Sequence, residues 1–544
     1  MLRIRGLQLH PKASLVGLFA VLILCGVAIG LERPSWRRQE VDWRMSGGSR
    51  IKAIHYPEDK PSSISTNGRR SRLMRKKTIP AKEGELTPQA EQTTIPIIAN
   101  VVDSPPIAGF VPWVVLSVTD ARSGELEIDA IPTTSVTGDF LPYTDPQSDY
   151  GIGIFDSGSS AHVISYVDAA QVGLYGPPYP SDYLTSNMIE ISGVIGSVFT
   201  WVSQPIAVFI DGLGAIEPNG LIVDNSGMVG ETNVSVLVGD PFESPNVPTV
   251  IGTPLSVYFA TCFRNDRQLT ITRDGNVFTS PDIRLYDSSD PCVPSYSNTI
   301  YLELRPTGGQ AVQYLFDPFD PYFSPLSPSI IMVLLSGQSL FFTSRTDLAH
   351  NNKTSTQKKF MVDTGAQVSV ISESQATELG IQKSNPDFWV EITGVTGETI
   401  DAKGFIIDQI EISADPEWLV FTNVPVVMLN VASPEGGTLE GIIGMNLFIE
   451  FNLVLRGGGL PDYGGHTLEL EPIDYLAVAD IAPGDGDGKV DNLDLAVFVE
   501  AWLATSTSSN WNPRADMAPP VRDGRVDLLD LDVLAEYWSE DVSP

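Results

Sequence analysis

The stretch FMVDTGAQVSVIS, residues 360–372, recurs in altered form as GIFDSGSSAHVIS, residues 153–165. In both copies an apolar run leads into an Asp, a small hydroxyl residue and a Gly, and a second apolar run ends in Ile-Ser. Asp156 and Asp363 hold the equivalent place in the two copies. A strand that delivers a carboxylate into a tight turn, twice in one chain, predicts two carboxylates that face one another.

Two carboxylates held a few ångströms apart cannot both ionise at low cost, so such a pair shares one proton. The charged member can then take a proton from a water molecule while the protonated member donates a hydrogen bond to a substrate carbonyl. The small hydroxyl residue after each Asp supplies a group that orients the carboxylate. The duplicated motif therefore predicts general acid–base hydrolysis of an amide without a covalent intermediate.

FDSGSS at 155–160 resembles the active-site turn of pepsin-like aspartic peptidases, and VDTGAQVSVIS at 362–372 resembles the retropepsin type. The shared-proton carboxylate pair of aspartic proteases is the standard example of the effect described above. The resemblance implies Asp156 and Asp363 as catalytic residues and no cofactor for catalysis. It also implies five residues that support the turns: Ser157, Gly158, Ser159, Thr364 and Gly365. We expect His162 to be a structural side chain and not a third catalytic group.

Two further elements repeat in the same order. VIGTPL at 250–255 corresponds to IIGMNLF at 442–448, and EISGVIGS at 190–197 corresponds to EITGVTGE at 391–398. The latter pair resembles the flap hairpins that close over a bound peptide, with four flap-like glycines, Gly193, Gly196, Gly394 and Gly397. Both tips lack the Tyr of the pepsin-like flap, so the chain is more similar to two retropepsins in tandem.

Short apolar runs bounded by Gly, Pro, Asn and Asp dominate from about residue 101 to 470, which is typical of β structure. Short helices are expected at 165–174 and 372–381, directly after each active-site strand. The predicted fold class is mainly β, with two related aspartic-peptidase-like lobes at 101–290 and 291–472 and a cleft between them.

A chain of 544 residues is too long for one core, and its net charge of −33 argues against nucleic acid and anionic membrane surfaces as partners. Residues 1–30 combine a basic start with an apolar run at 14–30, which predicts a signal peptide or a membrane anchor. We expect export, to the medium or the cell surface, with membrane attachment if 14–30 is retained.

Residues 31–100 are polar and basic and predict a disordered linker or a pro-segment. In an exported protein, Cys262 and Cys292 could form a disulfide, and the alternative is two buried free thiols.

Residues 476–544 contain a second repeat, in which ADIAPGDGDGKVDNLDLAVFVEAWL at 479–503 corresponds to ADMAPPVRDGRVDLLDLDVLAEYWS at 515–539. An Asp-rich loop with a Gly at its turn, followed by an amphipathic helix, suits calcium. The apolar positions Leu495, Val497, Phe498 and Leu503 favour a helix face. The candidate calcium ligands are Asp480, Asp485, Asp487, Asp491, Asp494, Asp516, Asp523, Asp527 and Asp530.

This tail resembles a small α-helical, EF-hand-like dockerin module, which implies a cohesin-like or cell-surface partner. The first loop is longer than usual between Asp480 and Asp487, and Val521 and Arg522 leave the second loop with fewer acids, so calcium is better supported at the first loop. The alternative is a helical hairpin whose acids are merely solvated.

The sequence leads to an exported aspartic endopeptidase acting on a peptide or protein substrate. The alternative is a catalytically inactive, peptidase-like binding or scaffold protein of the cell surface, kept open by the asymmetry between FDSGSS and VDTGAQ. A dockerin-bearing glycoside hydrolase would also use two carboxylates, but the Asp-Ser/Thr-Gly repeat points elsewhere.

Overall fold

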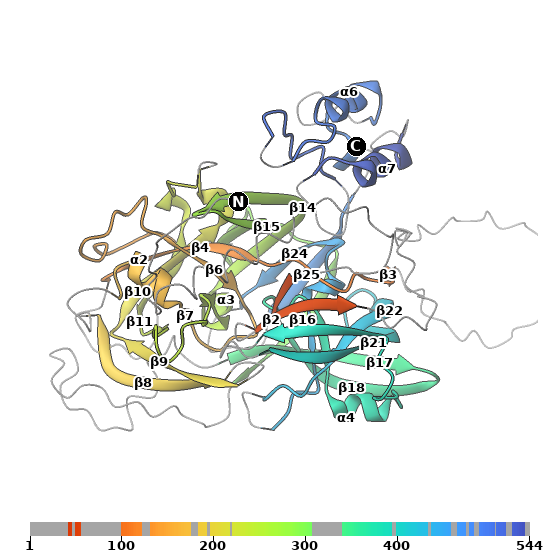
Figure 1. The fold of residues 1–544 in the computed structure, drawn as a ribbon, viewed down its shortest axis with the longest axis horizontal. Helices are drawn as coiled ribbons and strands as arrows, with labels where there is room; N and C mark the ends of the chain where they lie inside the picture. Colours follow the sequence, from red (N-terminus) through yellow and green to blue (C-terminus); the bar gives the residue numbers. More distant parts are fainter. Residues whose placement is uncertain are drawn as a thin grey trace, which may run out of the picture.

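The computed structural model describes residues 42–45, 49–55, 100–121, 131–175, 183–192, 196–217, 220–306, 340–393, 399–433, 437–458, 465–474, 478–482, 489–505, 508–517 and 525–538. The structure is mainly β, as predicted, and its strands lie in two sheets (Figure 1). Within the described ranges, none of the helices combines the length and the apolar character that crossing a bilayer requires. The predicted signal or anchor at 1–30 lies outside these ranges.

The first sheet has ten strands and carries the first copy of the motif. Their order is β5 (Ile131–Thr133), β11 (Val229–Val234), β10 (Ile206–Gly212), β4 (Trp113–Thr119), β6 (Gly151–Phe155), β13 (Val250–Ile251), β7 (Val163–Ile164), β12 (Leu237–Val238), β9 (Ser197–Ser203) and β8 (Leu184–Ser192).

The second sheet has 15 strands and carries the second copy. Its order is β1 (Asp42–Met45), β2 (Ser49–His55), β20 (Phe388–Thr393), β21 (Thr399–Ile412), β22 (Leu419–Met428), β19 (Ser369–Ile371), β23 (Gly441–Ile443), β18 (Lys353–Val362), β17 (Leu340–His350), β16 (Asn298–Pro306), β25 (His466–Pro472), β24 (Phe451–Arg456), β14 (Phe259–Arg273) and β15 (Asn276–Asp287). β3 (Asn100–Asp103) lies beside β22, and β21 also pairs with β17, so part of this sheet closes on itself.

The same strand pairing surrounds both copies of the motif. β6, which precedes Asp156, pairs in parallel with β13, and β18, which precedes Asp363, pairs in parallel with β23. The strand that follows each Asp, β7 or β19, then runs antiparallel to β13 or β23 and parallel to β12 or β22. The repeat seen in the sequence is therefore a repeat of strand connections.

Each copy also continues into the short helix that the sequence predicts. α2 (Tyr166–Gln171) begins after Ser165, whose hydroxyl accepts a hydrogen bond from the backbone N–H of Asp168. α4 (Glu373–Glu378) begins after Ser372, which caps it in the same way through Gln375. Ser at the N-cap satisfies a backbone donor that the first helical turn leaves open. The remaining short helices of this part of the chain are α3 (Thr253–Tyr258) and the 3₁₀ turns η3 (Leu213–Ala215), η4 (Asn225–Gly227) and η6 (Met445–Leu447).

The flap-like segments are β hairpins. β8 and β9 pair up to Ser192 and Ser197, and β20 and β21 pair up to Thr393 and Thr399. Gly196 has a φ of +73°, a left-handed conformation that favours glycine. Gly193, Gly394 and Gly397 lie outside the described residues.

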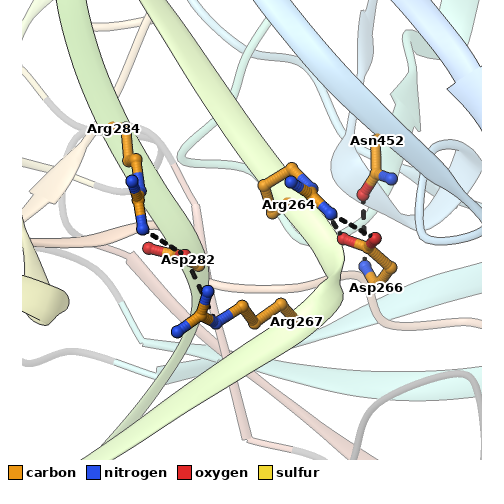
Figure 2. A network of polar contacts seen from close by, with 6 residues as sticks. All are labelled: Arg264, Asp266, Arg267, Asp282, Arg284 and Asn452. Carbon is orange, nitrogen blue, oxygen red and sulfur yellow. Dashed lines mark hydrogen bonds and ion pairs between the residues drawn. The ribbon is translucent and has the colours of Figure 1, made fainter. Parts of the chain in front are cut away.

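The β14–β15 hairpin links the two halves of the structure. It falls within the predicted first lobe, but β14 pairs with β24 in the second sheet. A bulge interrupts its register after Arg264, where Asp266 contacts Arg264 and the Asn452 side chain (Figure 2). Opposite the bulge, Asp282 accepts ion-pair contacts from Arg267 and Arg284 (Figure 2).

The largest buried apolar cluster crosses from one sheet to the other. It includes Phe155 beside the Asp156 turn, Phe263 on β14 and Phe448 after the second Gly-containing element. Phe263 contacts Phe155 at a ring-centroid distance of 5.8 Å. Because this core is continuous, the turns that carry Asp156 and Asp363 are supported by shared packing.

Two strands lie within the segment that the sequence predicts as a disordered linker or pro-segment. β2 pairs antiparallel with β20, with Ile51 opposite Ile392, and β1 pairs with β2. The edge of a sheet offers unpaired backbone groups that an additional strand can bond. Residues 42–45 and 49–55 are therefore paired strands, against the expectation of disorder, and the alternative of a pro-segment stays a prediction.

The tail forms helices α6 (Asn492–Glu500) and α7 (Leu528–Glu536), which Figure 1 shows apart from the two sheets. Its buried apolar side chains, among them Phe498, Val526 and Leu534, form a cluster of their own. Leu503 departs from the helix face predicted for it: it follows α6, has a φ of +60° and is 69% exposed.

Candidate active site

Asp156 and Asp363 each stand at the end of a buried strand. All five residues of β6 are buried before Asp156, and the last three of β18, Phe360, Met361 and Val362, are buried before Asp363. The apolar runs at these places can satisfy their backbone groups only within a sheet, so they form strands in the interior. The chain then turns at Gly158 or Gly365, and each carboxylate is left at the turn.

Each turn holds its own carboxylate with two backbone donors. The N–H groups of Gly158 and Ser159 donate to Oδ1 of Asp156 at 2.8 and 3.1 Å. Gly365 and Ala366 donate to Oδ1 of Asp363 at 2.9 and 3.1 Å. These bonds fix Oδ1 of each carboxylate, and with it the direction in which Oδ2 points.

Crossed hydrogen bonds join the two turns. The backbone N–H of Ser157 donates to Oγ1 of Thr364 at 3.0 Å, and the backbone N–H of Thr364 donates to Oγ of Ser157 at 3.1 Å. Each hydroxyl also donates to the carbonyl that precedes the opposite Asp, Ser157 to Val362 at 2.9 Å and Thr364 to Phe155 at 2.8 Å. The hydroxyl residues expected to support their own turns therefore support the opposite one.

The glycines of the two turns lie against the opposite carboxylates. A Cβ on Gly158 would lie 2.5 Å from Cγ of Asp363, and a Cβ on Gly365 would lie 2.5 Å from Cγ of Asp156. Carbon atoms without a bond between them do not approach so closely, so any side chain at either position would displace a carboxylate. This reciprocal contact shows that Asp156 and Asp363 meet across the two turns.

The electrostatics of the pair favour a shared proton. Burial raises the pKa of Asp363 well above its usual range, and the neighbouring charge of Asp156 and a hydrogen bond with it raise that pKa further. The N–H groups of Gly365 and Ala366 act in the opposite direction. Asp156 is 1% exposed and Asp363 is 0% exposed. This arrangement favours one proton shared between the two carboxylates.

A Gly-containing segment, one from each copy of the repeat, is bonded to each turn. Asp156 donates its backbone N–H to the carbonyl of Ile251 at 2.8 Å, and Asp363 donates to Ile443 at 3.1 Å. A Cβ on Gly252 would lie 2.5 Å from the carbonyl oxygen of Ala161. A side chain at this position would therefore push the segment away from the turn.

The sequence does not reveal that His162 is tied to Glu231. His162 Nε2 lies 2.9 Å from Oε2 of Glu231, and both side chains are fully buried. The His162 ring is therefore held inside the fold, as expected for a structural side chain. Ser159 also has a local role, because its hydroxyl donates to the carbonyl of Ala161 at 2.9 Å.

The tail places its Asp residues at helix starts. Asp491 and Asp494 form a capping box at α6, and Asp527 and Asp530 form the same box at α7. Asp494 Oδ1 also accepts the backbone N–H groups of Ile481 and Ala482.

Backbone donors therefore occupy Asp491, Asp494, Asp527 and Asp530. Asp480 and Asp516 are buried. Three of the expected calcium ligands, Asp485, Asp487 and Asp523, lie outside the described residues. Within the described ranges, which leave out 483–488 and 518–524, no three acidic, His or Cys side chains form a metal-binding group.

The two cysteines do not pair. Cys262 is a buried free thiol on β14, and Cys292 is an exposed free thiol. Cys262 packs with Ala260, Val293 and Val454, so its side chain faces an apolar cluster. The expected disulfide is wrong, and the alternative of two buried thiols is right for Cys262 alone.

The sequence of the second half agrees with this geometry. Residues 348–447 match the family model for aspartyl proteases. The matched stretch includes Asp363 with its turn, the β20–β21 hairpin and Gly444. The match supports an aspartic peptidase, and the turn that carries Asp156 lies outside the matched residues.

Two solved structures are similar to the chain. One is a retropepsin-like aspartic protease from Rickettsia conorii, at 21% identity and a TM-score of 0.15, covering 24% of this chain and 81% of that one. The other is basic 7S globulin from soybean, at 12% identity and a TM-score of 0.27, covering 66% of this chain and 96% of that one. No curated protein sequence matches the chain.

Proposed function

We propose that this protein is an aspartic endopeptidase in which Asp156 and Asp363 act together on a peptide bond. The observation that supports this most is the reciprocal contact of Gly158 and Gly365 with the opposite carboxylates, together with the crossed bonds between the turns. We interpret the two sheets as the two related lobes of such an enzyme, with the β8–β9 and β20–β21 hairpins as its flaps.

In the proposed reaction, Asp156 is charged and Asp363 carries the shared proton. Water attacks the carbonyl carbon of the scissile bond, its proton passes to Asp156, and the proton of Asp363 passes to the carbonyl oxygen. The resulting gem-diol then collapses: a proton returns to the Asp363 carboxylate from one hydroxyl, and Asp156 gives its proton to the leaving nitrogen as the C–N bond breaks. The division of roles between the two carboxylates is part of the proposal, and the raised pKa of Asp363 supports it as the acid.

The test is hydrolysis of a mixed peptide library by the full chain between pH 3 and 8. Asp156→Asn and Asp363→Asn are compared with the native sequence, because the Asn side chain keeps the shape and removes the acid. We expect either substitution to abolish cleavage and a pepstatin-like inhibitor to block the native enzyme. Cleavage that survives both substitutions would refute the proposal.

A second candidate function is a peptidase-like binding or scaffold protein without catalysis. The burial of both carboxylates favours it, since Asp156 and Asp363 have almost no solvent-exposed surface to meet a water molecule. This function predicts that peptides bind to the native protein and to both Asn variants with equal affinity and are recovered intact. Peptide binding by fluorescence anisotropy, followed by mass spectrometry, separates the two functions.

We further propose that residues 1–30 direct export and that the tail recruits the enzyme to a cohesin-like or cell-surface partner. The support is the sequence pattern of each segment. Calcium would be held at the first tail loop by Asp480, Asp485 and Asp487, since carboxylate oxygens are the ligands that this ion prefers. Calcium titration of the full chain, with Asp485→Asn/Asp487→Asn as the comparison, tests the site, and loss of binding in that variant is the expected result.

A further inference from the structure

His162 joins the first catalytic turn to a buried acid. Its Nδ1 accepts the backbone N–H of Gly252 at 3.0 Å, and its Nε2 lies 2.9 Å from Oε2 of Glu231. Because Nδ1 accepts a hydrogen bond, the ring proton is on Nε2 and is donated to the carboxylate. The two bonds fix both the tautomer of the imidazole and the direction of its ring.

The residues on either side of Gly252 hold the turn that carries Asp156. Ile251 accepts the backbone N–H of Asp156. Thr253 donates its backbone N–H to the carbonyl of Ser159 at 2.8 Å and its hydroxyl to the carbonyl of Ser157 at 2.7 Å. His162 therefore anchors the middle of a three-residue segment whose two ends hold the catalytic turn.

The second copy has the same arrangement with neutral groups. Ser369, at the place equivalent to His162, accepts the backbone N–H of Gly444 at 3.1 Å. The Ser369 hydroxyl donates in turn to Oδ1 of Asn446 at 2.9 Å. Both turns thus need a side-chain acceptor at this position, and two unrelated pairs of residues supply it. The recurrence with different chemistry indicates that the acceptor itself is required.

Among the described residues, the Glu231 side chain makes a hydrogen bond to His162 alone. It is fully buried on β11, and its Oε1 has no hydrogen-bond partner in that part of the chain. A buried carboxylate with a single partner costs free energy. Here the buried Glu231 carboxylate fixes the direction of the His162 ring.

We propose that His162, oriented by Glu231, is a positioning residue for Asp156 in peptide hydrolysis. This inference rests on the proposed endopeptidase function. His162 acts through its hydrogen bond with Gly252, which fixes the position of segment 251–253. This segment in turn fixes the backbone of the first turn, and the turn holds the Asp156 carboxylate against Asp363. A small misplacement of a reacting group lowers the rate of the chemical step by up to about 100-fold while leaving substrate binding in place.

Two double variants test the effect of the hydrogen-bond acceptor at position 162. Glu231→Leu is introduced in both, so that no unpaired carboxylate is left in the core. His162→Asn then keeps an oxygen where Nδ1 lies, and His162→Leu has no acceptor there. We expect the Asn form to keep kcat within about fivefold of the native enzyme and the Leu form to lose about 10- to 100-fold, with KM unchanged within about threefold in both. Equal kcat values for the two forms would overturn the proposal.

A measurement on the native full chain keeps the test independent of folding and of catalysis. With ¹⁵N-labelled histidine, we expect a buried imidazole protonated at Nε2 and unprotonated at Nδ1, and its signal should disappear in the His162→Asn form. A signal for His162 protonated at Nδ1 would overturn the inference. If the native chain cleaves no peptide yet shows the expected tautomer, the endopeptidase proposal fails while the anchoring of Gly252 stands.

Discussion

The crossed hydrogen bonds between the two turns make a prediction about stability and activity together. Ser157→Ala removes one hydroxyl, which accepts the backbone N–H of Thr364 and donates to the carbonyl of Val362. Thr364→Val removes the equivalent hydroxyl from the other turn, with its bonds to Ser157 and Phe155. Each change deletes two buried bonds that cross from one half of the site to the other.

The cost follows from what each substitution leaves behind. Ser157 is fully buried and Thr364 is 1% exposed, so water does not replace the lost partners. An unsatisfied buried backbone group costs about 1–3 kcal/mol, and each variant strands an N–H and weakens the hydrogen bonding of a carbonyl. We expect each to lower the free energy of unfolding by about 2–4 kcal/mol. Either substitution alone already loosens the contact between the turns. The double variant should therefore lose about 1–2 kcal/mol less of the free energy of unfolding than the sum of the two single-variant losses.

Urea titration followed by tryptophan fluorescence measures these differences, with equal m-values as the condition for comparing them. Peptide hydrolysis on the same samples should show kcat lowered by about 10- to 100-fold in each single variant, because the carboxylates lose their alignment. Ser160→Ala, in the same turn, is the matched control and should change the free energy of unfolding by less than about 0.5 kcal/mol. Single variants as stable as this control, or a double variant with fully additive costs, would refute the reasoning.

Three further predictions concern protons and thiols. Hydrolysis should be lost as the pH rises through the raised pKa of Asp363, because the proton for the substrate carbonyl is then gone; a pH–rate profile that keeps rising to alkaline pH would contradict this. Burial raises the pKa of Asp211 to about 6, so between about pH 4 and 6 the native state keeps a proton that the unfolded chain has released. The free energy of unfolding should therefore fall by about 2–3 kcal/mol as the pH rises from about 4 to above 6. In Asp211→Asn the urea midpoint should depend less on pH over that range. Cys292 should react with a maleimide in the native protein, whereas Cys262, whose pKa burial raises to about 12, should react after unfolding; mass spectrometry of tryptic peptides identifies the labelled residue, and rapid native labelling of Cys262 would show that its packing is wrong.

The elements that the sequence predicts best are those whose signal is local. The apolar run before each Asp, the Gly at the turn and the Ser that caps the next helix all lie within the quoted stretches, and the structure has a buried strand, a turn and a short helix at each. The flap-like hairpins were likewise evident from two segments that repeat. Repetition raised these patterns above the many ordinary turns that contain Asp and Gly.

The elements that the sequence did not reveal depend on pairing between distant residues. The β14–β15 hairpin joins the second sheet through β24, which lies far along the chain, and no local pattern encodes that choice. The His162–Glu231 contact joins residues 69 apart, and each alone resembles an ordinary polar side chain in a β-rich region. The disulfide was wrong because cysteine number says nothing about side-chain direction, and Cys262 faces an apolar cluster.

The two turns show which parts of the motif can vary and which cannot. Ser157 and Thr364 differ by a methyl group yet make the same crossed bonds, since only a backbone N–H and a hydroxyl are needed. Gly158 and Gly365 cannot vary, because the opposite carboxylate occupies the space of a Cβ. The Ser/Thr difference between FDSGSS and VDTGAQ therefore preserves the crossed bonds between the turns. A further difference lies outside these six-residue stretches: the Gly252 segment is held by His162 with Glu231, whereas the Gly444 segment is held by Ser369 with Asn446.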